Sequence, residues 1–596
     1  MPRRGDGVEL LDANGLPEIG EYEQIPSLHE LDAPHLMRGE SGGSTWQTAN
    51  LDRFFIRLYT YMREKGFWVI ITSRVLNVVT LGFTIVLSGF LLMYVNWGAL
   101  THKCIGDGSC DILKEAVYQH PLQHGSALGN AICVLYLIIF SVYWLWTCLR
   151  FVLDFRETWE IRDFCNVRLG VSDRELQTIT WPELVDRVVA AQRTLRLCLV
   201  KELTPHDIVS RIMRKENYLI AMLNMDVLGL GVNLPGGHRH VFMTKTLEWN
   251  LYWTILDQMF DDNFTVRHSF LNDEGALRQR LGRVAAINIL LSPFTAIFMT
   301  IYFFLRNAEK FYHHPSSIGA RRWTSLAKWK LREFNELPHF FDERLTRSIQ
   351  PAEKYVTQFP SPIVSMLAKF VAFVVGSFAA ILLVVAFIDE ALLEAQMHGR
   401  NLLWYAAVFG TVLAISRSLI MDDRVVYDPE GAMGELVLHT HYMPKHWRGK
   451  CGTPEVQREL ESLFQFKAVL FLEELASIFV TPLLLWKVLP ARAGRVLAFV
   501  RDFTVHVDGM GDLCSLSVFD FERHGNRKYG SPFHCEKGRR SRQGKMEKSF
   551  VSFQSNYPSW QPGASGARLA ANLSEFRMRQ SVVGGGDSAA ASSSRA

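Results

Sequence analysis

The uncharged stretch VAAINILLSPFTAIFMTIYFFL, residues Val284–Leu305, decides the class of protein. It is long enough to cross a bilayer, which takes about 20 apolar residues in a helix. Both of its ends are basic, with Arg278, Arg280 and Arg283 before it and Arg306 and Lys310 after it. Because Lys and Arg collect on the cytosolic side, two basic flanks predict that both ends face the cytosol. Pro293 interrupts the centre, so we expect a re-entrant segment of a polytopic membrane protein.

The composition fits a mixture of membrane segments and a substantial soluble part. The 596 residues are 48% hydrophobic and 21% charged, with a net charge of +4 that is too small to indicate nucleic-acid binding. The nine cysteines form no CxxC pair, which argues against a zinc ribbon or a disulfide-dense secreted fold. Cys104 and Cys110 fall in a predicted lumenal loop and could form a disulfide. No apolar run precedes Trp68, so no cleavable signal peptide is expected.

Four more stretches are long and apolar enough to span the bilayer. They are Val75–Val95, Ala127–Leu149, Ile363–Phe387 and Leu402–Met421. The loop inside each pair carries several acidic and few basic residues, whereas the outer flanks are rich in Arg. This asymmetry places both chain termini in the cytosol.

A sixth apolar segment, Ala468–Trp486, contains Glu473, Glu474 and Pro482. A charge at the bilayer centre costs about 2.5–3.5 kcal/mol on insertion scales, so a lipid-exposed span is disfavoured. Both flanks are again basic, which predicts a second re-entrant segment.

The expected fold class is all-α, a polytopic membrane protein with four transmembrane helices, two re-entrant membrane segments and a helical cytosolic domain. The predicted organisation is a disordered cytosolic arm (1–50), an interfacial helix and first transmembrane pair (51–150), the cytosolic helical domain (151–282), the first re-entrant segment and a basic stretch (283–362), the second pair (363–421), a cytosolic segment with the second re-entrant segment (422–522, with 468–486 in the membrane) and a disordered tail (523–596).

Short patterns typical of enzymes lack the context that those motifs need. Gly39–Gly43 matches G-x-S-x-G but lies in a polar Gly/Ser-rich arm, without the strand and helix of a nucleophile elbow. His439, His441 and His446 could hold zinc, but no Cys or carboxylate lies at matching spacing, and a structural role is favoured. Gly509-Met-Gly511 lacks the lysine of a phosphate loop. We therefore expect no enzyme, cofactor or metal.

Several unusual strings resemble the autophagy-related protein 9 family. They are LDRFF (51–55), REFNELPH (332–339), AEKY (352–355), HYMPKHW (441–447), FQFKAV (464–469) and GDLCS (511–515). The resemblance covers roughly residues 50–525. It implies four spans, two re-entrant segments, a domain-swapped homotrimer and ATP-independent scrambling of phospholipids between leaflets. The implied partners are a bridge-like lipid-transfer protein of the autophagy-related protein 2 type and the early autophagy kinase complex. The implied locations are the preautophagosomal structure, cytoplasmic vesicles, and Golgi and endoplasmic reticulum membranes.

The lipid pathway expected from the sequence rests on polar residues inside the apolar segments. Lys369 and Arg417 lie at similar depth, each on a helical stripe of small residues that allows close helix packing. Ionisable residues at such places mark a pathway or pair with a partner, and Glu473 and Glu474 are available as partners. We expect this cluster to receive the lipid phosphate, with Asn288 and Ser292 as polar lining. Alternatively, Lys369 and Arg417 snorkel to the cytosolic interface.

Two other functions stay open from the sequence. The chain could be a trimeric membrane scaffold that recruits autophagy machinery without transport, or an ion-conducting pore. Purified protein in liposomes separates the three, because it would show lipid exchange, no transport or ion flux.

Overall fold

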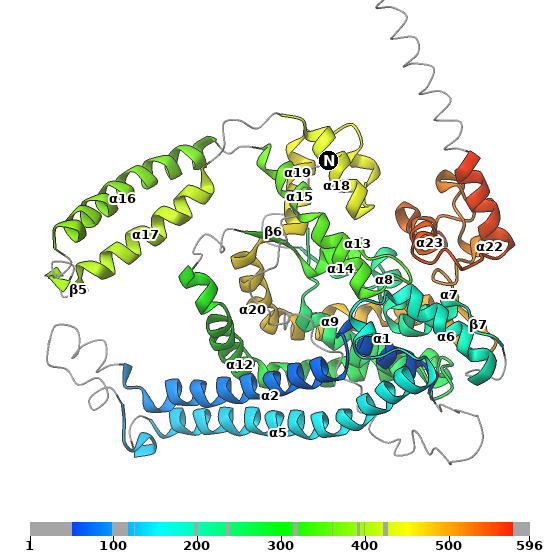
Figure 1. The fold of residues 1–596 in the computed structure, drawn as a ribbon, viewed down its shortest axis with the longest axis horizontal. Helices are drawn as coiled ribbons and strands as arrows, with labels where there is room; N and C mark the ends of the chain where they lie inside the picture. Colours follow the sequence, from blue (N-terminus) through cyan, green and yellow to red (C-terminus); the bar gives the residue numbers. More distant parts are fainter. Residues whose placement is uncertain are drawn as a thin grey trace, which may run out of the picture.

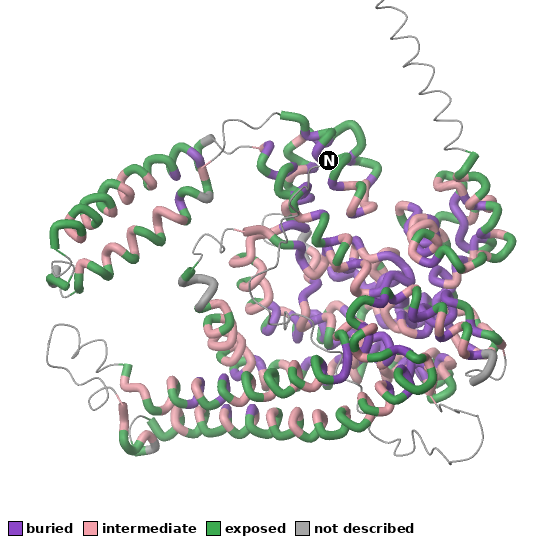
Figure 2. The backbone as a smooth tube through the Cα atoms, in the orientation of Figure 1, coloured by how far each residue is buried: buried purple, intermediate pink, exposed green. Residues whose placement is uncertain are grey.

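The computed structural model describes residues 50–97, 117–123, 126–195, 201–233, 239–313, 320–359, 362–389, 394–397, 400–420 and 427–575. This part of the chain is mostly helical, as expected, and its strands form small antiparallel pairs. Figure 1 shows two long helical hairpins extending from a denser helical region. Buried residues gather in that region and are sparse along the hairpins (Figure 2). Residues 1–49 of the expected arm (1–50) and the Cys104 and Cys110 pair lie outside the described residues.

The denser region, called the helical domain below, is built around one apolar core. Its elements are α1 (Leu51–Arg63), α6 (Trp181–Leu195), α7 (Pro205–Ile212), α8 (Arg214–Asn224), β1 (Gly231–Asn233), β2 (Arg239–Val241), α9 (Lys245–Leu251), η6 (Tyr252–Leu256), α10 (Asp257–Met259), α11 (His268–Asn272), α13 (Ser325–Leu331), α21 (Ala493–Asp502), β7 (Thr504–Val507), β8 (Gly511–Cys514), α22 (Phe521–His524) and α23 (Lys545–Asn556).

Helix α1 differs from the interfacial helix expected at the start of the 51–150 segment. The Asn50 side chain accepts from the Arg53 N–H and starts the helix, as an N-cap should. Phe55 and Leu58 are almost completely buried, and α1 packs against α7 inside the core. The amphipathic pattern therefore reflects a helix covered by protein. Periodicity alone does not distinguish that cover from a membrane surface.

A second core lies beside the helical domain. Its elements are α14 (Pro338–Arg347), α15 (Ile349–Thr357), α18 (Pro429–Thr440), α19 (Pro454–Leu463) and the antiparallel strands β3 (Arg321–Trp323) and β6 (Phe464–Phe466). Trp323 pairs with Phe464 across the two strands, and both side chains are buried. The strand pair thus ties two segments distant in sequence at the point where α20 begins.

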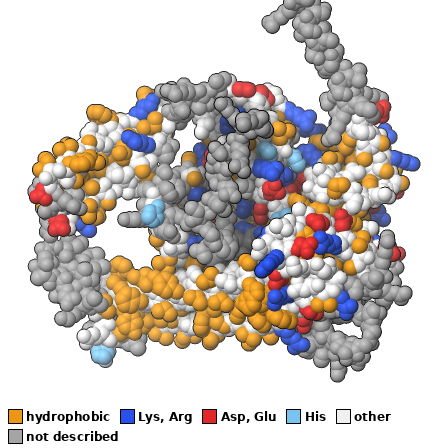
Figure 3. Space-filling model, viewed as in Figure 1, with side chains coloured by type: hydrophobic (Ala, Val, Ile, Leu, Met, Phe, Trp, Pro, Cys, Tyr) orange, Lys and Arg blue, Asp and Glu red, His pale blue; other side chains and the backbone are white. Residues whose placement is uncertain are grey.

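The described part of the chain contains five helical stretches long and apolar enough to cross a membrane, and one shorter apolar helix. They lie in α2 (Phe67–Gly89) with η2 (Phe90–Tyr94), α5 (Ala127–Asp163) with η4 (Phe164–Arg168), α12 (Glu274–His313), α16 (Pro362–Ile388), α20 (Lys467–Leu483) with η10 (Leu484–Val488) and α21, and the shorter α17 (Leu402–Leu419). Hydrophobic side chains cover the visible face of the α2–α5 pair (Figure 3). All predicted membrane segments therefore fall on apolar helices.

The two helical hairpins are formed by α2 with α5 and by α16 with α17. In the first, Tyr136 Oη donates to Ser88 Oγ at 2.9 Å, and Trp144 Nε1 donates to the Val78 carbonyl at 3.0 Å. A Cβ at Gly82 would lie 2.9 Å from Trp144 Nε1, so the helices need glycine to approach this closely. The second hairpin turns at β4 (Gln396–Met397) and β5 (Arg400–Asn401).

Pro293 does not interrupt helix α12, contrary to the break expected there. The helix continues through it as one element from Glu274 to His313. Figure 1 shows α12 changing direction along its length. A proline bends a helix because its ring displaces one hydrogen bond. The expectation that α12 returns to the side of the membrane from which it enters stays a prediction.

Residues 523–575, which were expected to belong to a disordered tail, form the C-terminal part of the helical domain. Residues 521–575 contain α22, α23 and a further helix at 564–575. Phe550, Phe553, Tyr557 and Leu569 are buried in the main core. The basic composition of this segment concealed an apolar face that becomes covered on folding.

Candidate functional site

Two of the predicted pathway residues are joined through helix α9. Asn288 Nδ2 of α12 donates to Asn250 Oδ1 at 2.8 Å. Asn250 Nδ2 donates to the Thr246 carbonyl at 2.8 Å, and the Thr246 N–H donates to Glu474 Oε1 of α20 at 3.0 Å. A continuous chain of hydrogen bonds therefore links Asn288 to Glu474 where α12 and α20 meet the helical domain.

Glu474 accepts from the first N–H groups of α9, next to the N-cap residue Thr244. Its Oε2 accepts from the Lys245 N–H at 3.2 Å, and its Oε1 also accepts from Thr246 Oγ1 at 3.2 Å. The first N–H groups of a helix have no partner within it, and the helix dipole favours a negative charge there. The contact fixes α20 against α9, so Glu474 has a positioning role that the sequence did not indicate. The neighbouring Glu473 is half-buried.

Polar residues form a stripe on each of α12 and α20. On α12 these are Asn288, Ser292 and Thr295. Ser292 is only 7% exposed and donates to the Ile289 carbonyl. On α20, Ser477 and Thr481 follow Glu474 at helical spacing, and both are buried. Sequence reasoning missed these two, although their spacing from Glu474 was the signal that could have identified them.

Lys369 and Arg417 occupy a different part of the molecule. Lys369 lies near the start of α16 and Arg417 near the end of α17, so they share one end of the hairpin. Both side chains are exposed, while Ser365 and Ser416 beside them are buried. In Figure 1 this hairpin stands apart from α12 and α20. Lys369 and Arg417 therefore belong to the α16–α17 hairpin and Glu473 and Glu474 to α20, and the cluster of all four stays a prediction.

The three histidines weighed as a zinc site have separate surroundings. His441 Nδ1 lies 2.9 Å from Glu333 Oε1, whereas His446 Nε2 lies 2.7 Å from Glu459 Oε2. The His439 carbonyl accepts from Arg344 Nη1 at 2.8 Å. Among the described residues, no group of three or more His, Cys, Asp or Glu side chains is placed to hold a metal ion.

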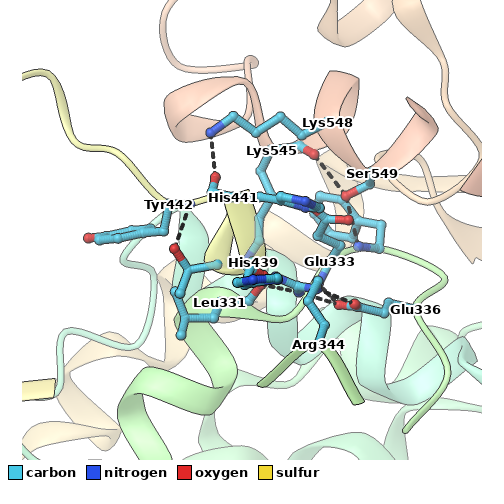
Figure 4. Close-up of polar contacts among 12 residues, drawn as sticks. Leu331, Glu333, Glu336, Arg344, His439, His441, Tyr442, Lys545, Lys548 and Ser549 are labelled. Carbon is cyan, nitrogen blue, oxygen red and sulfur yellow. Dashed lines mark hydrogen bonds and ion pairs between the residues drawn. The ribbon is translucent and has the colours of Figure 1, made fainter. Parts of the chain in front are cut away.

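A buried charged cluster joins three distant segments of the chain (Figure 4). Arg344 of α14 forms two 2.8 Å contacts with the Glu336 carboxylate. Glu333 pairs with His441 at the end of α18, and Lys548 of α23 donates to the His441 carbonyl at 2.6 Å. The cluster thus fastens the C-terminal segment to the helices beside it.

The surroundings strongly shift the pKa values of two groups in this cluster, Glu333 and Lys545. Burial alone would raise the pKa of Glu333, but the hydrogen bond with His441 and the nearby Arg344 hold it at about 2. Burial lowers the pKa of Lys545 to about 7, against the attraction of Glu333 and Glu336. Lys545 Nζ donates to the Lys330 carbonyl at 3.0 Å, at the C-terminal end of α13, where a cation is favoured.

A family model described as autophagy protein ATG9 matches residues 44–520. The chain belongs to the ATG9 family. Autophagy-related protein 9 of Arabidopsis thaliana is 48% identical over 584 residues, which cover 94% of this chain and 67% of that protein. The Neurospora crassa protein of the same name is 34% identical, over 95% of this chain and 67% of that protein. The cryo-EM structure of Schizosaccharomyces pombe Atg9 matches with a TM-score of 0.59 and 31% identity, over 79% of this chain and 99% of that chain.

Family membership confirms the resemblance drawn from the motifs and supports a role in autophagy. In this ATG9 chain, the REFNELPH string holds elements together. Asn335 has a left-handed backbone, with φ of 55°. Its N–H donates to Asn217 Oδ1 at 3.0 Å, and its Nδ2 donates to the Ser517 carbonyl at 2.7 Å. His339 Nδ1 lies 2.8 Å from Tyr59 Oη of α1. The motif thus binds α1, α8 and the C-terminal segment into one core.

Proposed function

We propose that this ATG9 chain scrambles phospholipids between membrane leaflets without ATP. The barrier to lipid exchange is the passage of a polar headgroup through hydrocarbon, where an unpaired polar group costs several kcal/mol. The polar stripes on α12 and α20 are the observation that carries the proposal, because they lie on otherwise apolar helices. Polar surface at membrane depth is tolerated where it lines a protein-enclosed or wet cavity.

The proposed assembly is a homotrimer with four spans, two re-entrant segments (α12 and α20) and both termini in the cytosol. The α16–α17 hairpin supports it, because its small residues Ala407 and Gly410 are exposed in a single chain. A second copy would cover them and could bring Lys369 and Arg417 to the polar stripes of its neighbour. Detergent-corrected mass should then be near three times 68.1 kDa.

The proposed setting is the preautophagosomal structure, cytoplasmic vesicles, and Golgi and endoplasmic reticulum membranes. The proposed partners are an autophagy-related protein 2 type lipid-transfer protein and the early autophagy kinase complex. The setting and the partners are proposed from the family to which the chain belongs. A pull-down with the full chain tests each partner separately.

A liposome assay tests the activity. Protein reconstituted in vesicles that carry a fluorescent lipid in both leaflets should let an impermeant quencher bleach both, whereas protein-free vesicles lose only the outer half. Bleaching limited to the outer half would favour the scaffold. Ion leakage without lipid exchange would favour the pore.

A further inference from the structure

Helices α10, α11 and the first turns of α12 surround a cavity of about 140 Å³. A water molecule in the liquid occupies about 30 Å³, so the cavity has room for a phosphate-sized group. Its apolar floor is formed by Phe270 and Leu277, both buried. Its polar lining includes Arg267, Arg280, Ser269 and Gln258. None of these residues belongs to the polar stripes described above.

The two arginines of this cavity lie beyond ion-pair distance of the described carboxylates, although Arg267 is near enough to Asp261 to help lower the pKa of that carboxyl. Neither Arg267 nor Arg280 forms an ion pair with a described residue. Arg280 Nη1 donates to the Thr254 carbonyl at 3.3 Å, and the charges that act on Arg280 are those of Arg283 and Arg267, which repel it. Other surface arginines of this chain are paired with a carboxylate. Arg278, for example, forms an ion pair with Glu274.

The nearby carboxylates are already engaged. Asp273 lines the cavity, but its Oδ1 accepts from the Ala276 N–H at 2.8 Å and caps α12. Asp261 lies near Arg267, but its oxygens accept from Asn263 and Thr265. The guanidinium groups therefore keep donors available for an external anion.

The cavity also lies close to the start of the membrane segment. Arg280 precedes Val284, where the uncharged stretch begins, by four residues, or about 6 Å along a helix. The headgroup layer on each side of the hydrocarbon is of similar thickness, about 5–8 Å. A lipid headgroup could therefore reach the cavity while its acyl chains stay in the bilayer.

We propose that Arg267 and Arg280 form a binding site for a terminal phosphate group, either that of a phosphate-monoester lipid headgroup or that of free phosphate. Guanidinium groups match phosphate because they offer two parallel N–H donors in a fixed plane. Ser269 and Gln258 add hydroxyl and amide groups to the same cavity. The site does not depend on scrambling, since it would retain a lipid or an ion in a protein that transports nothing.

Calorimetric titration of the full-length protein in neutral detergent tests the proposal. The three probes are water-soluble dihexanoyl phosphatidic acid, dihexanoyl phosphatidylcholine and inorganic phosphate. We expect saturable binding of the phosphatidic acid, about one per chain, and little binding of the phosphatidylcholine. Arg267→Gln and Arg280→Gln should each weaken binding about tenfold, the effect of losing about 1.4 kcal/mol of charge-assisted contact. Arg278→Gln, which removes an exposed arginine outside the cavity, should change nothing.

The arms of the experiment also identify the source of the phosphate. Equal binding of inorganic phosphate would assign the site to the free ion, and binding of phosphatidic acid alone would assign it to a lipid. Arg280→Gln could loosen the fold through the lost Thr254 contact. Arg267→Gln, for which no such contact exists, keeps the test decisive. No saturable binding, equal binding of phosphatidylcholine, or unchanged binding by Arg267→Gln would each overturn the proposal.

Discussion

Asp52 of α1 and Arg214 of α8 form a buried ion pair across 162 positions of the chain. Arg214 Nε lies 2.6 Å from Asp52 Oδ2, and the two side chains are 3% and 8% exposed. Arg211 contacts the same carboxylate at 2.7 Å. Arg214 also donates to the Met510 and Asp512 carbonyls at 2.7 Å, so the pair fastens the β7–β8 hairpin to α1. Two of the family strings, LDRFF and GDLCS, therefore meet at one guanidinium group.

Replacing Asp52 with Ala should destabilise the helical domain by about 3–5 kcal/mol. The change leaves Arg211 and Arg214 buried without their anion, which is the costly way to break such a pair. Thermal unfolding in detergent measures it. Glu435→Ala is the matched control, because it breaks the exposed Lys354–Glu435 pair and should cost at most about 1 kcal/mol. Equal effects of the two substitutions would contradict the role given to Asp52.

Glu547→Gln should stabilise the docked C-terminal segment at neutral pH and not in acid. Burial raises the pKa of Glu547 from 4.5 to about 7 in the folded chain. Between these values the unfolded carboxyl is ionised while the folded one keeps its proton, so the folded form loses stability as pH rises from 4.5 to 7. Glutamine does not titrate and avoids this loss. The stabilisation by the variant should therefore grow over that window to about 3 kcal/mol above pH 7.

Hydrogen exchange of the α23 amides, compared between variant and wild type at each pH, measures this difference. The exposed Glu522 of α22 supplies the control, and Glu522→Gln should leave the exchange of α23 the same at all pH values. A stabilisation by Glu547→Gln that is equal at pH 4.5 and pH 8 would show that the carboxyl is already ionised in the folded segment.

The apolar helices could be predicted from the sequence because their signal is local. A run such as Ile363–Phe387 has no charge other than Lys369 and is long enough to cross a bilayer, whatever it packs against. The family could be recognised for the related reason that its strings are contiguous. Asp52 and Asn335, which those strings contain, then prove to be buried contact residues.

What the sequence did not predict depends on contacts between distant segments. The amphipathic pattern of α1 looks the same whether α7 or a lipid surface covers it. The basic tail hides Phe550 and Tyr557, which are buried only when α23 docks. Glu474 looks like a free carboxylate until α9, some 230 residues earlier in the chain, places its N-terminus there. Each case needed the tertiary partner.

Glu474→Ala should loosen α9, whereas Glu474→Gln should largely preserve it. Alanine leaves the Lys245 and Thr246 N–H groups without an acceptor, a loss of about 0.5–2 kcal/mol for a helix cap. Glutamine keeps one acceptor oxygen. Hydrogen exchange over α9 should accelerate about tenfold in the alanine variant only, in line with a loss of about 1.4 kcal/mol. If the glutamine variant scrambles lipids as slowly as the alanine variant, the charge of Glu474 serves the lipid path and not the cap.

Both ends of α12 should be accessible from the cytosolic side. This expectation rests on the basic residues on each side of Val284–Leu305, because Lys and Arg collect on the cytosolic side of a membrane. Single cysteines replacing Arg278 and Lys310, in a background depleted of the nine native cysteines, should both react with an impermeant reagent added from the cytosol. Each variant reports on its own end, and a cysteine in the predicted lumenal loop 96–126 serves as the unlabelled control. Labelling of the two ends from opposite sides would make α12 a span and overturn the four-span topology.

Replacing Lys369 and Arg417 together with Leu should slow scrambling in proteoliposomes without dissociating the proposed trimer. Both side chains are exposed at one end of the α16–α17 hairpin, so a lipid or a neighbouring copy can reach them. A positive charge there would attract the lipid phosphate and lower the cost of moving it off the surface. Removing both charges should reduce the rate about tenfold or more, the effect of losing about 1.4 kcal/mol of stabilisation. Lys369→Arg should be tolerated, because charge matters here more than shape. A double-Leu protein that scrambles at the wild-type rate would show that the two side chains only snorkel to the interface and that the pathway follows the polar stripes of α12 and α20 without them.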